Sequence, residues 1–352
     1  MRKTLSPYYV DVPLVSPLTS NTCSKYTLSI RVWDGLQASV PSLPTYAKTV
    51  INSSVSTGTH TINISRLIND YIELEPQSNG STGVIDGRNQ QWVQTSITYV
   101  DTDNNIEADD VILTELIVKG YGYGNEGKNP STPTNKTFIS GTEFNTSRTG
   151  IFTLPIETDA LTVTAISYPD NEINFSQLLT ATTDSSESVK YMYVDLTETT
   201  TDTYVEIVYN GITTTLNILD ECKYDPIDIV FFNKEGGQQV LTFFKDKTDS
   251  LKVKDESYES DRGQASDGNH QFIRYNVQAR SSFKVHSGFV DESMNETFRQ
   301  LLLSSKMWSY DGSTFTPLNI KTTSFEEKTR QRERLISYEI EFEMSYNEIN
   351  NT

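Results

Sequence analysis

The chain has 352 residues, with 47 acidic and 29 basic side chains, so its net charge is −18. This charge argues against a protein whose main task is to bind DNA or RNA, in a sequence-specific way or otherwise, because phosphate binding needs a basic surface. Only three histidines and two cysteines are present, and no paired short spacing among them suits a structural zinc site. Composition therefore favours a β-rich protein that is not an enzyme and uses no cofactor.

The first residues imitate a signal peptide without matching one. Arg2 and Lys3 supply the basic start, but Pro7, Asp11 and Pro13 interrupt the apolar stretch that must follow. No window approaches the roughly 18 apolar residues of a membrane-spanning helix. We therefore expect synthesis in the cytoplasm and no membrane insertion.

Residues 1–125 are expected to form an N-terminal β-rich domain. Apolar and polar residues alternate over 26–32, which predicts a strand. Apolar residues at helical spacing over 64–72 predict a short helix that Asn63 or Ser65 caps.

An acidic loop follows a predicted strand in this domain. Asp101, Asp103 and Asn105 are spaced like the start of a calcium loop. An EF-hand also needs a glycine at position 6 and a glutamate at position 12, where this chain has Ile106 and Ile112. The favoured interpretation is a solvated loop, with an irregular Ca²⁺ site as the alternative.

A glycine- and proline-rich segment, 126–135, is predicted to be a linker. Just before it, Gly122, Gly124 and Gly127 match the spacing of a dinucleotide-binding loop. Such a loop must lead directly into a helix whose N-terminus binds the pyrophosphate. Pro130 prevents a helix from forming there. No nucleotide site is therefore expected.

Residues 136–220 contain short β-like segments separated by Ser/Thr-rich stretches, which predict a small β-sandwich. Asn210-Gly211 lies between two of these segments and is a strong hairpin signal.

Residues 221–352 are expected to form an α+β domain, and its packing on the first domain is left open. A hairpin is predicted over 226–245, a charged loop over 251–268 and a helix over 291–307. Ser293 and Glu296 fit a capping box for that helix. The fold class predicted for the whole chain is mainly β and multi-domain, with a few short helices.

The final strand is acidic on one face. Its glutamates are most simply a solvent-facing row, but like charges on one strand face destabilise it, so they can also line an interface or a lumen. The basic run before the strand either solvates a loop or meets the acidic surface of a neighbouring subunit. The candidate interface residues are Glu339, Glu341, Glu343, Arg330, Arg332 and Arg334.

Catalytic residues cannot be assigned. A glycosidase needs two carboxylates at a set separation, but 47 acidic residues make such pairs indistinguishable from background. A carboxylate-dependent depolymerase therefore stays only as a third hypothesis. The three histidines show no partner spacing, and no metal or nucleophile signature occurs.

Several segments together form a recognisable overall pattern. They are Pro7-Tyr8-Tyr9-Val10, the strand 26–35, Glu221-Cys222-Lys223-Tyr224, Ile229-Val230-Phe231-Phe232-Asn233-Lys234, Gly236-Gly237, Pro317-Leu318-Asn319-Ile320-Lys321 and the closing strand 335–343. This pattern resembles virion structural proteins of tailed phages that infect Bacteroidetes, including the crAss-like group. The resemblance covers about half of the chain, chiefly 1–75 and 221–349.

This resemblance implies a structural subunit in a tail ring, collar or tail-tip/baseplate hub. Its partners would be other copies of itself and neighbouring tail proteins, its location the virion tail, and it implies no catalytic residues. An alternative is a receptor- or glycan-binding β-sandwich of the tail, with host surface glycan as partner. Exposed aromatic platforms near Trp33, Trp92 or Trp308 would favour that alternative.

Overall fold

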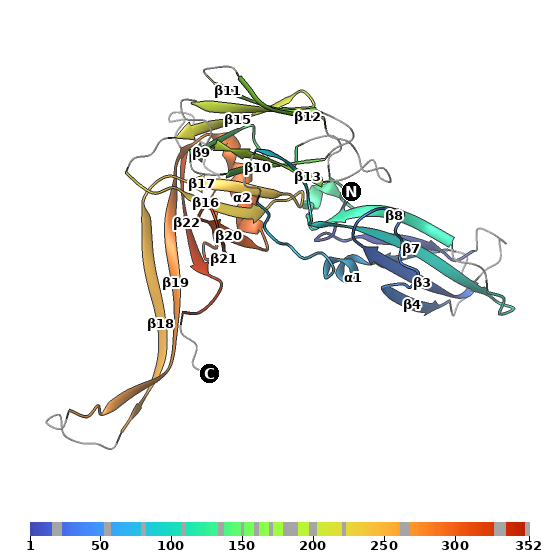
Figure 1. Ribbon diagram of the computed structural model, residues 1–352. Helices are drawn as coiled ribbons and strands as arrows, with labels where there is room; N and C mark the ends of the chain where they lie inside the picture. Colours follow the sequence, from blue (N-terminus) through green and yellow to red (C-terminus); the bar gives the residue numbers. More distant parts are fainter. Residues whose placement is uncertain are drawn as a thin grey trace.

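The prediction of a mainly β fold with several sheets and short helices is confirmed. The structure is a computed structural model that describes residues 1–15, 23–52, 58–78, 82–106, 110–132, 137–148, 151–157, 162–168, 172–178, 189–196, 203–219, 223–260, 268–326 and 336–348. Within these residues the two α-helices are α1, Ser65–Asn69, and α2, Asn295–Leu303. Figure 1 shows an N-terminal sheet, a body of several sheets and a long two-stranded arm that projects from the body.

The N-terminal sheet has five strands in the order β1-β8-β7-β3-β4. They are β1 Arg2–Lys3, β8 Asp110–Val118, β7 Gln90–Asp101, β3 Cys23–Trp33 and β4 Tyr46–Ile51. A two-stranded ribbon, β2 Tyr9–Pro13 with β5 Thr59–Asn63, and helix α1 share a buried cluster with residues of this sheet. Asn63 accepts a hydrogen bond from the Ser65 N–H at the start of α1. The predicted short helix forms over residues 65–69 rather than 64–72, and its N-cap residue, Ile64, makes no side-chain capping bond.

Two sheets make up the middle part of the body. One has the order β10-β13-β6 and the other β12-β11-β14-β15-β9. Their bounds are β10 Ile151–Glu157, β13 Val189–Asp195, β6 Gly83–Asp86, β12 Glu172–Leu178, β11 Thr162–Tyr168, β14 Tyr204–Tyr209, β15 Ile212–Leu219 and β9 Glu143–Ser147. Asn210 and Gly211 have φ of 48° and 74° and join β14 to β15, as their sequence predicts. Strand β6 comes from residues before 125, so this part is not built from 136–220 alone.

The C-terminal sheet has seven strands in the order β17-β16-β20-β21-β22-β19-β18. They are β16 Ile227–Phe232, β17 Gln238–Phe243, β18 Lys247–Glu259, β19 Phe272–Val290, β20 Met307–Tyr310, β21 Phe315–Ile320 and β22 Ile336–Met344. Leu154 and Ile207 of the middle sheets belong to the same buried cluster as Phe231, Phe298 and Phe342. One hydrophobic core therefore crosses the boundary expected at residue 220.

Two local expectations in the C-terminal part are wrong. The predicted charged loop over 251–268 is strand as far as Glu259, where β18 ends. Both faces of that strand meet water, so its sequence lacks the one-sided apolar alternation that reveals a half-buried strand. The capping box of Ser293 and Glu296 does not form; the Asp291 side chain accepts from the Ser293 N–H instead and caps the short 3₁₀ turn η4, Glu292–Met294, before α2.

The predicted linker packs closely where the structure describes it. Lys3 N donates to Pro130 O, and Thr132 N donates to Met1 O, at 3.1 Å each. Residues 127–132 thus run along the first strand. The glycines before them lead into a three-residue 3₁₀ turn, η1 Gly124–Glu126, and the described residues place no α-helix there to hold a pyrophosphate.

A tight joint holds the N-terminal sheet to the C-terminal sheet. The Lys3 side chain is 2% exposed, and its Nζ lies 3.2 Å from a Glu126 carboxylate oxygen and 2.9 Å from one of Glu235. Burial would raise the pKa of Glu126, but hydrogen bonds from Lys234 and Lys3 lower it overall. Beside this cluster, the Tyr121 N–H donates to the Lys234 carbonyl at 2.8 Å. A buried ion cluster and a backbone bond thus fix the two sheets to one another.

The joint leaves no room for a side chain at Gly120. A Cβ there would lie 2.6 Å from the Lys234 carbonyl oxygen, whereas one at Gly124 would meet nothing within 4 Å. We expect Gly120→Ala to lower the free energy of unfolding by about 1–3 kcal/mol, because backbone must shift. Gly124→Ala is the matched control, since both changes restrict the unfolded chain equally. Urea unfolding measures both, and equal stability of the two variants would contradict a tight joint.

A buried carboxyl group in β16 makes stability depend on pH. Burial raises the pKa of Asp228 from 3.8 to about 6, although the Thr242 hydroxyl donates to it at 2.5 Å and opposes the rise. Between these two values the folded chain keeps a proton that the unfolded chain has lost. Stability from this group is therefore greatest at low pH and falls as the pH rises toward 6.

Asp228→Asn tests this dependence, because asparagine keeps an oxygen acceptor for Thr242 without the charge. We expect the variant to be more stable than the unaltered protein at pH 7, by on the order of 1–3 kcal/mol. The difference should vanish near pH 4. Thermal or urea unfolding across this range measures it, and a pH-independent difference would refute the assignment.

Candidate functional site

The most distinctive surface is the arm formed by β18 and β19. The nine residues Ser282–Val290 of β19 run beside β22, whereas residues 272–281 extend beyond it and keep β18 as their strand partner. At about 3.3 Å per residue these ten residues reach roughly 30 Å. Figure 1 shows this ribbon leaving the body and ending far from the other sheets.

Strand pairing assigns the arm side chains to two faces. Directly paired residues of antiparallel strands share a face, and successive residues alternate. The face that we call the lysine–tyrosine face comprises Thr248, Ser250, Lys252, Lys254, Glu256 and Tyr258 of β18 with Lys284, Ser282, Arg280, Gln278, Tyr275 and Ile273 of β19. The opposite face comprises Asp249, Leu251, Val253, Asp255, Ser257 and Glu259 with Phe283, Ser281, Ala279, Arg274 and Phe272.

A bulge divides the arm into an inner and an outer half. Asn276 and Val277 of β19 lie opposite the single residue Asp255, and Asn276 has φ of 50°. Asparagine tolerates this left-handed conformation better than most residues. Beyond the bulge, Arg274 donates to Asp255 at 2.8 Å, and this hydrogen bond lowers the pKa of Asp255. The ion pair joins the strands where the ribbon is most isolated.

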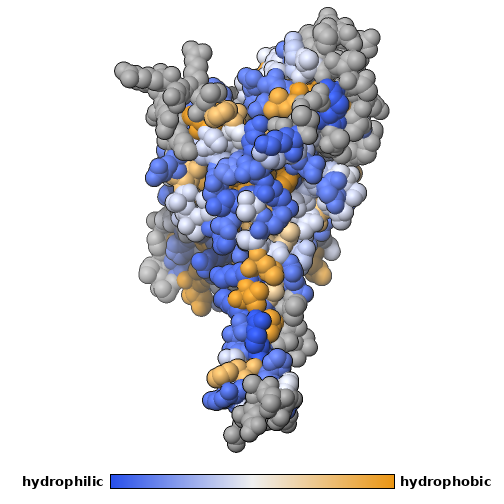
Figure 2. Space-filling view, turned by 90° about the vertical axis from the view of Figure 1, so that its left-hand side faces the viewer, coloured by the Kyte–Doolittle hydropathy of each residue, from blue (hydrophilic) through white to orange (hydrophobic). Residues whose placement is uncertain are grey.

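The outer half carries an apolar patch on the lysine–tyrosine face. The rings of Tyr258 and Tyr275 lie 5.7 Å apart, and Ile273 pairs directly with Tyr258. These side chains are 50%, 45% and 37% exposed. Figure 2 shows hydrophobic residues along the arm, interspersed with hydrophilic ones. Such a group of aromatic and aliphatic side chains on an extended ribbon is typical of an interaction site.

The predicted acidic row lies at the base of the arm, on the same side of the sheet as the lysine–tyrosine face. Glu339 contacts Lys284 at 2.7 Å and His286 at 3.4 Å, and Glu343 contacts Arg280 at 3.1 Å. The hydrogen bond from Lys284 lowers the pKa of Glu339. Basic side chains of the next strand thus neutralise the row.

Glu341, the third glutamate of the row, contacts the opposite neighbour of β22, next to β21 rather than on β19. Its carboxylate pairs with Lys321, just after β21. The three glutamates therefore act as cross-strand ion-pair partners, a role that their own strand sequence could not reveal. Arg330, Arg332 and Arg334, the other predicted interface residues, lie outside the described residues.

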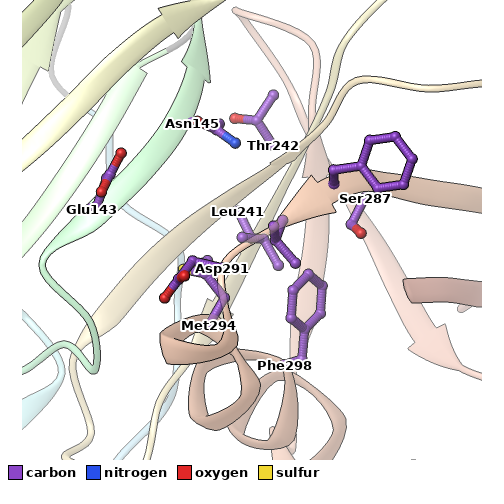
Figure 3. Close-up of a pocket in the computed structure, with 10 residues that line it drawn as sticks. Glu143, Asn145, Leu241, Thr242, Ser287, Asp291, Met294 and Phe298 are labelled. Atoms are coloured by element: carbon purple, nitrogen blue, oxygen red, sulfur yellow. The ribbon is translucent and has the colours of Figure 1, made fainter. Parts of the chain in front are cut away.

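A separate pocket of about 260 Å³ lies among β9, β17, β19 and the start of α2 (Figure 3). Glu143 and Asp291 border it with carboxylates, and Phe298 and Met294 supply apolar walls. Its hydroxyl groups are used structurally, since Thr242 donates to Asp228 and Ser287 donates to the Gly288 carbonyl. The described residues that line it include no His, Cys or Lys.

The other sequence motifs have structural partners. Asp101 accepts hydrogen bonds from the Asp103 and Asn105 N–H groups and from the Asn105 amide, which closes its loop. Among the described residues no group of three or more His, Cys, Asp or Glu side chains could hold a metal ion. Within the same residues no helix is long and apolar enough to cross a membrane.

The three tryptophans provide no exposed platform. Trp33, Trp92 and Trp308 are all buried. The Trp33 and Trp92 indoles donate to the carbonyls of Leu36 and Gly35. These three side chains pack in the core. They therefore do not provide the exposed aromatic platform that would favour glycan binding.

Comparison with known proteins adds no identification: no protein-family model matches the chain, and no curated protein matches it in sequence.

The ion pair between Glu341 and Lys321 can be tested by reversing charges. Glu341→Lys should destabilise the protein by about 0.5–1 kcal/mol, because it sets two lysines side by side in an exposed site. Adding Lys321→Glu should restore most of that loss. Urea unfolding of the single and double variants measures the coupling. Additive losses in the double variant would show that the pair contributes nothing.

Proposed function

We propose that the protein is a structural subunit that assembles with other copies of itself through its arm. The arm carries this proposal, because its ribbon of β18 and β19 projects from the body with apolar side chains in water. A two-stranded ribbon gains little stability in water by itself. Contact with a neighbouring subunit would bury the exposed side chains and order the ribbon.

A phage tail is the setting that we propose for this assembly. The sequence resemblance to virion structural proteins supports a tail ring, collar or tail-tip hub, with neighbouring tail proteins as further partners. A net charge of −18 suits a wall along which DNA passes, since like charges limit adhesion. Finding this chain by mass spectrometry in purified phage particles would support the setting, and its absence from intact particles would refute it.

Shortening the arm tests assembly directly. Val253 and Ala279 lie directly opposite one another in the two strands, so residues 254–278 can be replaced by an Asn-Gly turn. This change keeps the backbone hydrogen bond from Glu348 to Ala279. We expect the unaltered protein to have a mass in solution that is a multiple of 39.7 kDa and the shortened protein to be a monomer. Light scattering measures both masses, and circular dichroism verifies that the shortened body stays folded.

Two results would overturn the proposal. An unaltered protein that stays monomeric at all concentrations would refute self-assembly. A shortened protein that assembles as well as the unaltered one would refute the role of the arm.

A further inference from the structure

We infer that the lysine–tyrosine face of the arm is the contact surface and that it docks on the body of a second copy of this chain. This inference rests on the proposed function and makes it specific. It assigns one face of the ribbon, one kind of partner surface and a head-to-tail contact.

Charge distinguishes the two faces of the arm. The lysine–tyrosine face holds four basic side chains, Lys252, Lys254, Arg280 and Lys284, and a single acidic one, Glu256. Arg280 and Lys284 are paired with β22 glutamates. Lys252 and Lys254 border a shallow groove of about 140 Å³ whose lining also includes Arg280 and its partner Glu343. Among the described residues no ion pair joins either lysine to a carboxylate. These two ammonium groups are available to a partner.

The opposite face has the reverse balance. Apart from Lys247, the charged side chains on this face among the described residues are Asp249, Asp255, Glu259 and Arg274. Arg274 forms an ion pair with Asp255. This face exposes Leu251 and Val253, yet its acidic side chains would meet an acidic partner unfavourably. Both faces expose apolar side chains, so apolar exposure does not indicate which face is the contact surface. The difference in charge between the faces does.

The composition of the chain indicates which partner fits. Residues 247–286 hold seven Lys or Arg and six Asp or Glu, a net charge of +1, so the rest of the chain carries −19. A second copy therefore carries an excess of carboxylates outside its arm, and these are the groups that Lys252 and Lys254 would pair with. Charge complementarity of this kind steers encounter and fixes orientation.

The apolar patch provides the second half of the contact. Tyr258, Tyr275 and Ile273 follow the two lysines on the same face, toward the arm tip. Tyrosine gives a large contact area with few rotatable bonds, which favours it at the centre of interfaces. A basic pair next to an aromatic patch thus forms one continuous docking face.

The same charges determine the symmetry of the contact. Two arms that met through their lysine–tyrosine faces would bring Lys252 and Lys254 of each copy together, four ammonium groups in all. An arm on an acidic body avoids that repulsion and is heterologous, because different surfaces of the two copies meet. Heterologous contacts generate a ring when the rotation closes and a filament when it does not.

Paired variants on the two faces test this assignment. We expect K252E/K254E and Y258S/Y275S each to weaken self-association by roughly tenfold or more, and L251S/V253S on the opposite face to leave it unchanged. Sedimentation of the full-length proteins measures association, and circular dichroism verifies folding. For the unaltered protein, about 0.5 M salt should weaken association relative to about 0.05 M, because screening shortens the reach of charge.

The outcomes separate this inference from the proposed function. If the opposite-face variant dissociates and both lysine–tyrosine variants assemble, the face is wrong while arm-mediated assembly stands. If association is unaffected by salt and by K252E/K254E, an acidic partner surface is refuted. If the shortened arm assembles normally, the proposed function itself fails. Negative-stain images of rings or filaments would support a heterologous contact, and closed two-fold dimers would overturn it.

Discussion

The arm follows from a mismatch in strand length. Strand β19 has 19 residues and its inner neighbour β22 has nine, so β19 cannot stay inside the sheet along its whole length. Residues 272–278 of β19 lie beyond β22 and pair with β18, whereas Ala279 is still buried and accepts a backbone hydrogen bond from Glu348. The ribbon, its exposed apolar side chains and the division into two chemically different faces all derive from that mismatch.

A second constraint keeps the remainder of the molecule together. The N-terminal sheet meets the C-terminal sheet at Lys3, Glu126 and Glu235, where a buried cation is held by two carboxylates, and at Gly120, where two backbones touch. Removing one partner from a buried ion cluster costs far more than an exposed pair does. The ion cluster and the close backbone contact therefore hold the two sheets to one another.

Sequence pattern identified much of the fold where one face of an element is buried. The helix at residues 65–69, the Asn210-Gly211 hairpin and the final strand all carry a one-sided apolar pattern or a turn signal. The arm was missed, because a ribbon with two wet faces shows neither pattern. Leu251 and Val253, two residues apart in a charged segment, were the signal that could have indicated a strand. The glutamates of β22 were found, but their ion-pair partners on other strands could not be inferred from one strand alone.

The order of the C-terminal sheet has a consequence for the newborn chain. Strand β22 lies between β21 and β19, inside the sheet, although it is the last strand in the chain. Until residues 336–344 leave the ribosome, β19 and β21 have unpaired edges next to a gap in the core. Unpaired edges readily join other chains, so incomplete chains are exposed to premature association. The C-terminal sheet can therefore close around its core only after the last strand has joined it.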